Sequence, residues 1–200
     1  MKICIGTMMW QRFQIFEIWA TCIHRLQESF PEVNFDIVVV GSEGPQSRRL
    51  VEKHGFRYVE FSNHVLGAKA NARFQAMLES DSDFYVFTGS DDIISNQTFG
   101  LMLYLSRTFE EICTMTLYYY DTTSKKLMFS EGYRNTPREG EPLAPYRMLS
   151  KRVVDQMITP WDNDKQKFID AGVFKNIKKI TKNYVYHSGG MIMDIKNHIS

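Results

Sequence analysis

Two adjacent carboxylates, Asp91 and Asp92, stand two residues beyond the apolar run Phe84–Thr88, after Gly89 and Ser90. This run is short, rich in aromatic and β-branched residues, and closed by Gly89, which predicts a buried strand that ends at a crevice. Parallel α/β sheets bind their ligands at that end of the strands. Two carboxylates there repel each other and lose hydration, and a bound Mg²⁺ or Mn²⁺ relieves both costs. The pair therefore predicts a divalent-metal site, while its simpler interpretation is a cap on the following turn.

The strand before this pair is the last of four strand-like runs that alternate with helix-length segments. Such alternation predicts an α/β fold with a mainly parallel central sheet flanked by helices. The predicted strands are Lys2–Thr7, Asp36–Val40, Arg57–Phe61 and Phe84–Thr88. The predicted helices between them are Phe13–Phe30, Arg48–His54 and Leu66–Leu78.

The pattern loosens in the second half of the chain. Two strand-like runs flank a polar turn at residues 121–124, which predicts a small added β-hairpin formed by Ile112–Tyr120 and Lys126–Phe129. Residues 130–145 are rich in proline and glycine, and we expect a long surface loop there. Helical signals then resume at Lys151–Met157 and Lys165–Ile177, and short strands are expected within Tyr184–Asp194.

Length, charge and hydropathy narrow the class of protein. A chain of 200 residues with 44% hydrophobic content fits a single globular domain. The formal net charge of +1 argues against a nucleic-acid partner and against a polybasic membrane surface. No apolar run approaches the ~20 residues of a transmembrane helix, so we expect a soluble protein. Peripheral association with a membrane stays open.

The cysteines give an expectation about location. Cys4, Cys22 and Cys113 are odd in number, lie among apolar residues and lack the spacing of metal ligands. They are typical of buried thiols in a reducing compartment, which predicts a cytoplasmic protein.

Four segments of the chain resemble those of GT-A glycosyltransferases, particularly the family 2 enzymes. Ile3–Thr7 is similar to the first strand and nucleotide loop of the family, and Asp36–Gly44 to its second strand. Leu66–Arg73 resembles the family's Gly-x-x-x-Asn segment, and Gly89–Asp92 stands where the family has its Asp-x-Asp motif. The resemblance implies a Rossmann-like GT-A fold over 1–200. Residues 1–92 would form the nucleotide-sugar-binding half, and residues 93–200 the acceptor side.

The resemblance also implies a donor site. Asp91 and Asp92 would hold Mn²⁺ or Mg²⁺, which in these enzymes bridges the two phosphates of a nucleotide-sugar and stabilises the leaving diphosphate. Gly89 replaces the first acid of the motif, and Glu43 replaces the usual Asp beside the base. The residues implied on the donor nucleotide side are Thr7, Glu43, Lys69, Asn71, Arg73, Ser90 and Asp91. Lys69 and Arg73 would share one helix face, for which a solvated basic face is the competing interpretation.

Transfer to a hydroxyl also needs a base, and the family places an acid at the start of a late helix. Asp162, Asp164 and Asp170 are the candidates, and Asp170 resembles the family's base most closely, with Asp164 next. Each could instead be a helix cap or an exposed charge. A base at Asp170 implies a single displacement with inversion.

Four further residues are candidates for the acceptor side or the metal. Trp161 could form a wall for a sugar ring or belong to the core. Arg147 could meet phosphate or acceptor, or form a structural ion pair. Some members of the family that the chain resembles use a carboxy-terminal histidine as a third metal ligand, and His187 is preferred to His198 for that place. The competing interpretation of each is an ordinary surface histidine.

These observations predict a metal-dependent glycosyltransferase that moves a hexosyl or deoxyhexosyl group from a nucleotide-sugar to a hydroxyl acceptor, such as a glycan. A divalent-metal phosphotransfer or nuclease domain is the first competing interpretation, because such domains also gather carboxylates at strand ends. A non-catalytic nucleotide- or sugar-binding module of the same fold is the second, and Gly89 motivates it.

Overall fold

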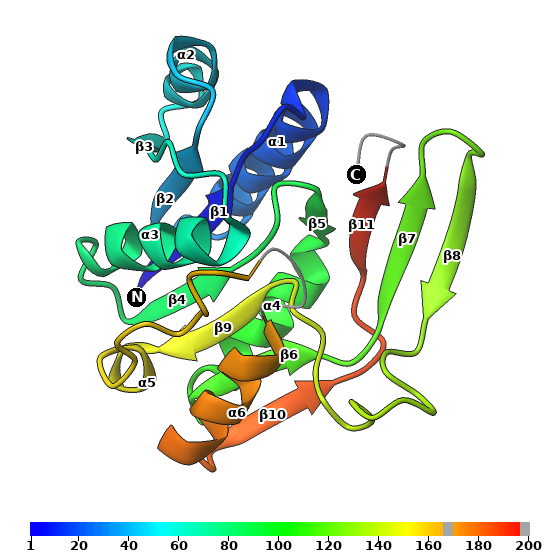
Figure 1. Cartoon of the computed structure of the whole chain (residues 1–200). Helices are drawn as coiled ribbons and strands as arrows, with labels where there is room; N and C mark the ends of the chain where they lie inside the picture. Colours follow the sequence, from blue (N-terminus) through cyan, green and yellow to red (C-terminus); the bar gives the residue numbers. More distant parts are fainter. Residues whose placement is uncertain (166–169, 197–200) are drawn as a thin grey trace.

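Most strands of the protein belong to one large sheet. The computed structural model describes residues 1–165 and 170–196, and Figure 1 shows their arrangement. Within these residues the large sheet has seven strands in the order β10-β6-β9-β4-β1-β2-β3. They are β1 Lys2–Met8, β2 Asn34–Gly41, β3 Arg57–Glu60, β4 Phe84–Phe87, β6 Glu111–Thr114, β9 Arg147–Ser150 and β10 Tyr184–His187. Only β9 runs antiparallel to its neighbours, so the sheet is mainly parallel, as predicted.

A smaller sheet of four strands stands beside the large one, on the right of Figure 1. Its strands, in spatial order, are β5 Asp92–Ile94, β11 Ile192–Lys196, β7 Leu117–Asp121 and β8 Lys126–Ser130. The predicted hairpin is confirmed as β7 and β8, and it lies in this smaller sheet. The predicted run Ile112–Tyr120 is divided at Met115 and Thr116, because its first half joins the large sheet and its second half the small one.

Helices cover both faces of the large sheet. Alternate residues of β1 point to opposite faces, so Ile3 and Ile5 lie in one hydrophobic cluster and Cys4 in another. Phe16 of α1 joins the first cluster, and Phe74 of α3 joins the second. The helices are α1 Phe13–Ser29, α2 Pro45–Lys53, α3 Leu66–Leu78, α4 Asn96–Leu105, α5 Lys151–Val154 and α6 Asp170–Ile180.

Local signals account for several element ends. Pro45 is the first residue of α2, where its fixed φ suits a helix and its missing N–H is not needed, so this helix begins before the predicted Arg48. Gly55 follows α2 with φ +71°, the left-handed conformation that closes many helices. At the start of α4, the Ser95 side chain accepts a hydrogen bond of 3.1 Å from the Thr98 backbone N–H.

The later helices differ from the predicted boundaries. The helix expected over Lys151–Met157 is shorter in the structure, where α5 ends at Val154. The second helix is described over Asp170–Ile180, and Lys165 is not helical: its carbonyl accepts a backbone hydrogen bond of 2.9 Å from the Gly67 N–H at the start of α3. This contact holds residues 162–165 against α3.

The pairing of β5 with β11 brings a further acidic residue beside the carboxylate pair. The two strands are antiparallel, and Asp92 lies directly opposite Asp194. The backbone N–H of Ile195 also donates to the Asp91 carbonyl at 2.9 Å, which extends the contact to the preceding turn. Strand β11 therefore lies directly beside Asp91 and Asp92, the carboxylate pair that follows β4. None of the helices in the described part of the chain combines the length and the apolar character that a bilayer crossing requires.

Candidate metal and donor site

The turn between β4 and β5 folds one carboxylate back onto its own backbone. The Gly89 backbone N–H donates to Asp92 Oδ2 at 2.6 Å, and Thr88 Oγ1 lies 3.4 Å from the same oxygen. A Cβ atom at position 89 would lie 2.5 Å from Asp91 Oδ1 and 2.7 Å from Asp92 Oδ2. A side chain at this position would therefore force the Asp91 and Asp92 carboxylates to move from where they lie.

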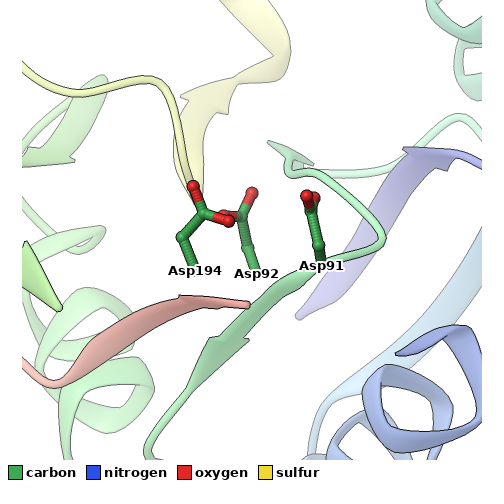
Figure 2. A group of neighbouring side chains, drawn as sticks. All are labelled: Asp91, Asp92 and Asp194. Carbon is green, nitrogen blue, oxygen red and sulfur yellow. The ribbon is translucent and has the colours of Figure 1, made fainter. Parts of the chain in front are cut away.

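A third carboxylate, Asp194, completes a cluster with Asp91 and Asp92. One oxygen from each of the three side chains lies within 4.8 Å of the others. Figure 2 shows the three carboxylates pointing to the same side: Asp91 lies just before β5, Asp92 begins β5, and Asp194 belongs to β11. Asp92 and Asp194 are buried, and Asp91 is half-buried. Sequence reasoning missed Asp194, although a single acid inside the apolar strand Ile192–Ile195 was a signal that could have identified it.

Two basic side chains offset this negative charge. Arg12 forms an ion pair with Asp91. Lys196 Nζ lies 2.7 Å from Asp194 Oδ2 and 3.6 Å from Asp91 Oδ2. The compensation is incomplete, because burial and the neighbouring carboxylates still raise the pKa of Asp92 and of Asp194 above the usual range.

The donor set fits a hard divalent cation. Asp194 Oδ1 is buried, and within the described part of the chain it has no hydrogen-bond partner, so its lone pairs are available to an ion. Three carboxylates at this separation match the oxygen ligands that Mg²⁺ and Mn²⁺ prefer. A bound cation would also relieve the repulsion among the three side chains. Asp91, Asp92 and Asp194 are thus the residues that could hold the metal.

The cluster opens into a cleft of about 440 Å³. Of the predicted donor residues, Lys69, Arg73, Ser90 and Asp91 line it, together with Asp92. Trp10, from the loop after β1, lines the same cleft and is 55% exposed. The cleft therefore combines carboxylates, basic side chains and an aromatic ring within one hollow.

The two basic residues of α3 donate hydrogen bonds to different segments of the chain. Lys69 Nζ donates to the Met9 carbonyl at 2.7 Å and to Ser42 Oγ at 3.0 Å, and burial lowers the pKa of its ammonium. Arg73 donates to the Thr88 carbonyl at 3.1 Å, and its guanidinium lies over the ring of Phe87 at 5.3 Å. Both are buried, which excludes a solvated basic face.

Three other donor candidates lie outside the residues that line the cleft. Thr7 is fully buried in β1, and Glu43 accepts a hydrogen bond of 2.7 Å from Ser47 Oγ at the start of α2. Asn71 holds the later loop: its side-chain amide donates to the Trp161 carbonyl at 2.7 Å, and its Oδ1 accepts from the Trp161 N–H at 3.1 Å. Asn71 also donates to Asn163 Oδ1 at 2.7 Å.

The two acceptor candidates are buried and are not among the residues that line the cleft. Trp161 is 4% exposed and packs against Phe74 and Phe87, with ring centroids 6.2 and 5.7 Å away. Arg147 is 3% exposed, and its Nε lies 3.8 Å from Glu111 Oε1. The structure therefore gives Trp161 a packing role and Arg147 an ion-pair partner.

The candidate bases follow Trp161 along the chain. Asp162 and Asp164 are exposed, and the backbone of Asp162 lies so close to α3 that a Cβ on Gly67 would be 1.8 Å from the Asp162 carbonyl oxygen. Asp170 begins α6, but its side chain lies outside the described part of the structure.

His187, the predicted third metal ligand, ends β10, and it is not among the residues whose ligand atoms gather within 4.8 Å of one another. Burial lowers the pKa of its imidazole. Neither ring nitrogen has a hydrogen-bond partner among the described residues, and a Cβ on Gly190 would lie 3.0 Å from the ring. His198 is outside the residues that the structure describes.

Comparison with known proteins identifies the fold. No protein-family model and no curated protein matches the sequence. The structure is similar to that of S. aureus TarS residues 1–349, with a TM-score of 0.71 and 14% identity over 98% of this chain and 60% of that one. The chain thus spans less than two thirds of that protein's length. The same TarS fragment has also been solved in complex with UDP.

Two other solved structures are informative. A mannosyltransferase from Pyrobaculum calidifontis, solved with GDP-Man and Mn²⁺, has a TM-score of 0.65 and 13% identity over 96% of this chain and 56% of its own. A CMP-2-keto-3-deoxy-manno-octonic acid synthetase complexed with CTP has a TM-score of 0.53 and 11% identity, covering 94% of this chain and 90% of its own. At these identities the likeness is one of fold: the chain has the Rossmann-like, GT-A-like α/β fold that the sequence predicted.

Proposed function

We propose that the protein is a metal-dependent glycosyltransferase that moves a sugar from a nucleoside-diphosphate sugar to a hydroxyl acceptor. The observation that carries this proposal is the cluster of Asp91, Asp92 and Asp194. Two of these, Asp91 and Asp92, line a cleft that Lys69 and Arg73 also line. The complexes of similar folds with UDP and with GDP-Man and Mn²⁺ support a nucleotide-sugar as the donor.

In this proposal the residues of the cleft have separate roles. The three aspartates hold Mn²⁺ or Mg²⁺, which when bound supplies Lewis-acid stabilisation of the departing diphosphate. Lys69 and Arg73 face the nucleotide side with Ser90, and their positive charge favours the diphosphate. Asp194 takes the third ligand position, for which His187 was the sequence candidate.

Four residues that the sequence suggested for the donor or acceptor side support the residues around the cleft without lining it. Thr7 supports the nucleotide side from β1, and Glu43 fixes the loop after β2. Asn71 holds Trp161, and the buried Arg147 positions β9 beneath the cleft. These roles retain the sequence candidates, but as residues that position the donor rather than touch it.

The acceptor side supplies the base. Asp170, or Asp164 in its place, accepts the proton of the acceptor hydroxyl while that oxygen attacks the anomeric carbon and the bond to the diphosphate oxygen breaks. A single displacement of this kind inverts the anomeric configuration. We propose a glycan as the acceptor and a hexosyl or deoxyhexosyl group as the sugar.

Nucleotide binding tests the donor assignment directly. Thermal shift with UDP, GDP, CMP and CTP, each with and without Mn²⁺, should show metal-dependent stabilisation by at least one nucleoside diphosphate. Asp92→Ala should abolish that stabilisation, whereas Asp155→Asn, an exposed aspartate at the end of α5, should leave it unchanged. Absence of any metal-dependent response in the wild type would refute the proposal.

Nucleotidyl transfer is the second candidate, because the fold is also similar to that of the synthetase solved with CTP. The two reactions leave different products. A glycosyltransferase releases a nucleoside diphosphate from a nucleotide-sugar, whereas a synthetase releases pyrophosphate from a nucleoside triphosphate and a sugar. Product analysis with both substrate pairs distinguishes them, and binding without either product would favour a non-catalytic module.

A further inference from the structure

Lys196, the last described residue of β11, places its ammonium among the carboxylates of the metal site. Its Nζ lies 2.7 Å from Asp194 Oδ2 and 3.6 Å from Asp91 Oδ2. Both side chains belong to the group whose ligand atoms lie within 4.8 Å of one another. The ammonium therefore uses oxygen lone pairs on two of the carboxylates that would hold a divalent cation.

The same side chain borders the donor cleft. Lys196 lines the hollow of about 440 Å³ together with Lys69 and Arg73. Its side chain is 42% exposed, compared with 19% for Arg12, the other basic partner of Asp91. Lysine also carries its charge on a flexible four-carbon stem. Of these two partners, Lys196 has the greater freedom to exchange one anionic group for another.

From this geometry we infer that Lys196 is an exchangeable counter-ion: its ammonium neutralises Asp194 and Asp91 before the metal binds and then moves to the donor diphosphate. A divalent cation on the same carboxylates repels the ammonium, because both are positive and close together. The diphosphate would bring the nearest new negative charge into the cleft. This inference rests on the proposed function and makes Lys196 a positioning residue for the donor.

The alternative is a fixed counter-ion that stays on Asp194 in every state. The two cases predict different results for Lys196→Met, which keeps the apolar stem and removes the charge. An exchangeable lysine competes with the metal but assists the nucleotide, so its loss should affect the two ligands in opposite directions. A fixed lysine affects the metal alone.

The first measurement is Mn²⁺ affinity without nucleotide, from the electron paramagnetic resonance signal of free Mn²⁺. Lys196→Met should bind Mn²⁺ about tenfold more tightly than the wild type, the effect expected when one charge-assisted contact no longer competes. Lys196→Arg retains the charge and should stay close to the wild type. The matched control is Lys126→Met, an exposed lysine on β8 away from the lining of the cleft, which should change nothing.

The second measurement is nucleoside diphosphate affinity by calorimetry at saturating Mn²⁺, using the nucleotide to which the wild type responds. Lys196→Met should bind it about tenfold more weakly, and Lys196→Arg should retain most of the affinity. Because Lys196→Met is expected to strengthen one ligand and weaken the other, general loss of folding cannot produce the pattern.

Three results would overturn the inference. Unchanged or weaker Mn²⁺ binding by Lys196→Met shows that the ammonium does not compete with the metal. Tighter Mn²⁺ binding with unchanged nucleotide affinity shows a fixed counter-ion. A wild type that binds Mn²⁺ but none of the nucleotides refutes the proposed function itself, and with it the transfer of Lys196 to a diphosphate.

Discussion

Asp194 lies directly opposite Asp92 because β11 and β5 pair as antiparallel strands with these two residues in register. A pair in direct register on antiparallel strands places its side chains on the same face of the sheet. Two carboxylates in this position normally destabilise a sheet, since like charges repel across the pair. Their burial increases that cost and points to a site built for a cation.

Replacement of Asp194 tests whether it is a metal ligand. We expect Asp194→Asn to weaken Mn²⁺ binding by at least about tenfold, because it removes a charged oxygen ligand from the cluster. The melting temperature of the metal-free protein should stay the same or rise, since the raised pKa of Asp194 means that its ionised form is unfavourable in the folded state. Differential scanning fluorimetry with Mn²⁺ and with EDTA measures both effects. A large loss of stability in EDTA would instead assign Asp194 a structural role.

Substitution of Gly89 tests the spatial requirement at the turn. Gly89→Ala should abolish Mn²⁺ binding, because a Cβ at this position would lie within 2.7 Å of both carboxylates and displace them. The matched control is Gly172→Ala in α6, where nothing lies within 4 Å of the added methyl group. That change should leave Mn²⁺ affinity unchanged. Calorimetric titration with Mn²⁺ compares the two variants, and wild-type affinity in Gly89→Ala would contradict the geometry.

The assignment of the base predicts a separation of binding from transfer. Asp170→Ala should leave donor binding intact and reduce transfer by about 10²- to 10⁴-fold, the usual contribution of a positioned base. Asp164→Ala should retain most of the activity if Asp170 is the base. The measurement pairs calorimetry for the donor with product formation under saturating conditions. Full transfer by Asp170→Ala would move the role to Asp164.

The cysteines predict a distinct pattern of thiol reactivity. Burial raises the pKa of Cys4 and of Cys113 to about 12, so at pH 8 roughly one thiol in ten thousand is ionised at each position. Cys22 is half-buried, and burial raises its pKa as well. We expect a thiol-specific disulfide reagent to label Cys22 first in the native protein and the other two only after unfolding. Peptide mass spectrometry of Cys22→Ser should then show almost no labelling before denaturant is added.

The sequence was sufficient to predict the first half of the sheet and the position of the carboxylate pair. Those features depend on local signals: the alternation of strand and helix periods, and a polar residue pair directly after a buried strand. The division of Ile112–Tyr120 between two sheets was not predictable, because the run is continuously apolar and aromatic. Nothing in its local pattern marks the change of sheet at Met115 and Thr116.

The third carboxylate and the roles of Asn71 and Gly67 required the structure. Asp194 reaches the site through a pairing of strands about one hundred residues apart in sequence. Gly67 and Asn71 act through contacts with the segment Trp161–Lys165, so their importance depends on where that segment folds. From the sequence, Gly89 was interpreted as the replacement of an expected acid. The structure shows that a side chain at this position would crowd the Asp91 and Asp92 carboxylates.

The three carboxylates come from two parts of the chain that are about one hundred residues apart in sequence. A cation held by Asp91, Asp92 and Asp194 would act as a non-covalent cross-link that closes a loop of about one hundred residues. By binding only when β11 is docked, the metal would lower the population of states in which this strand has detached. Hydrogen exchange of the β11 backbone amides would then slow when Mn²⁺ is added, so the site would stabilise the docked position of β11 as well as hold a phosphate.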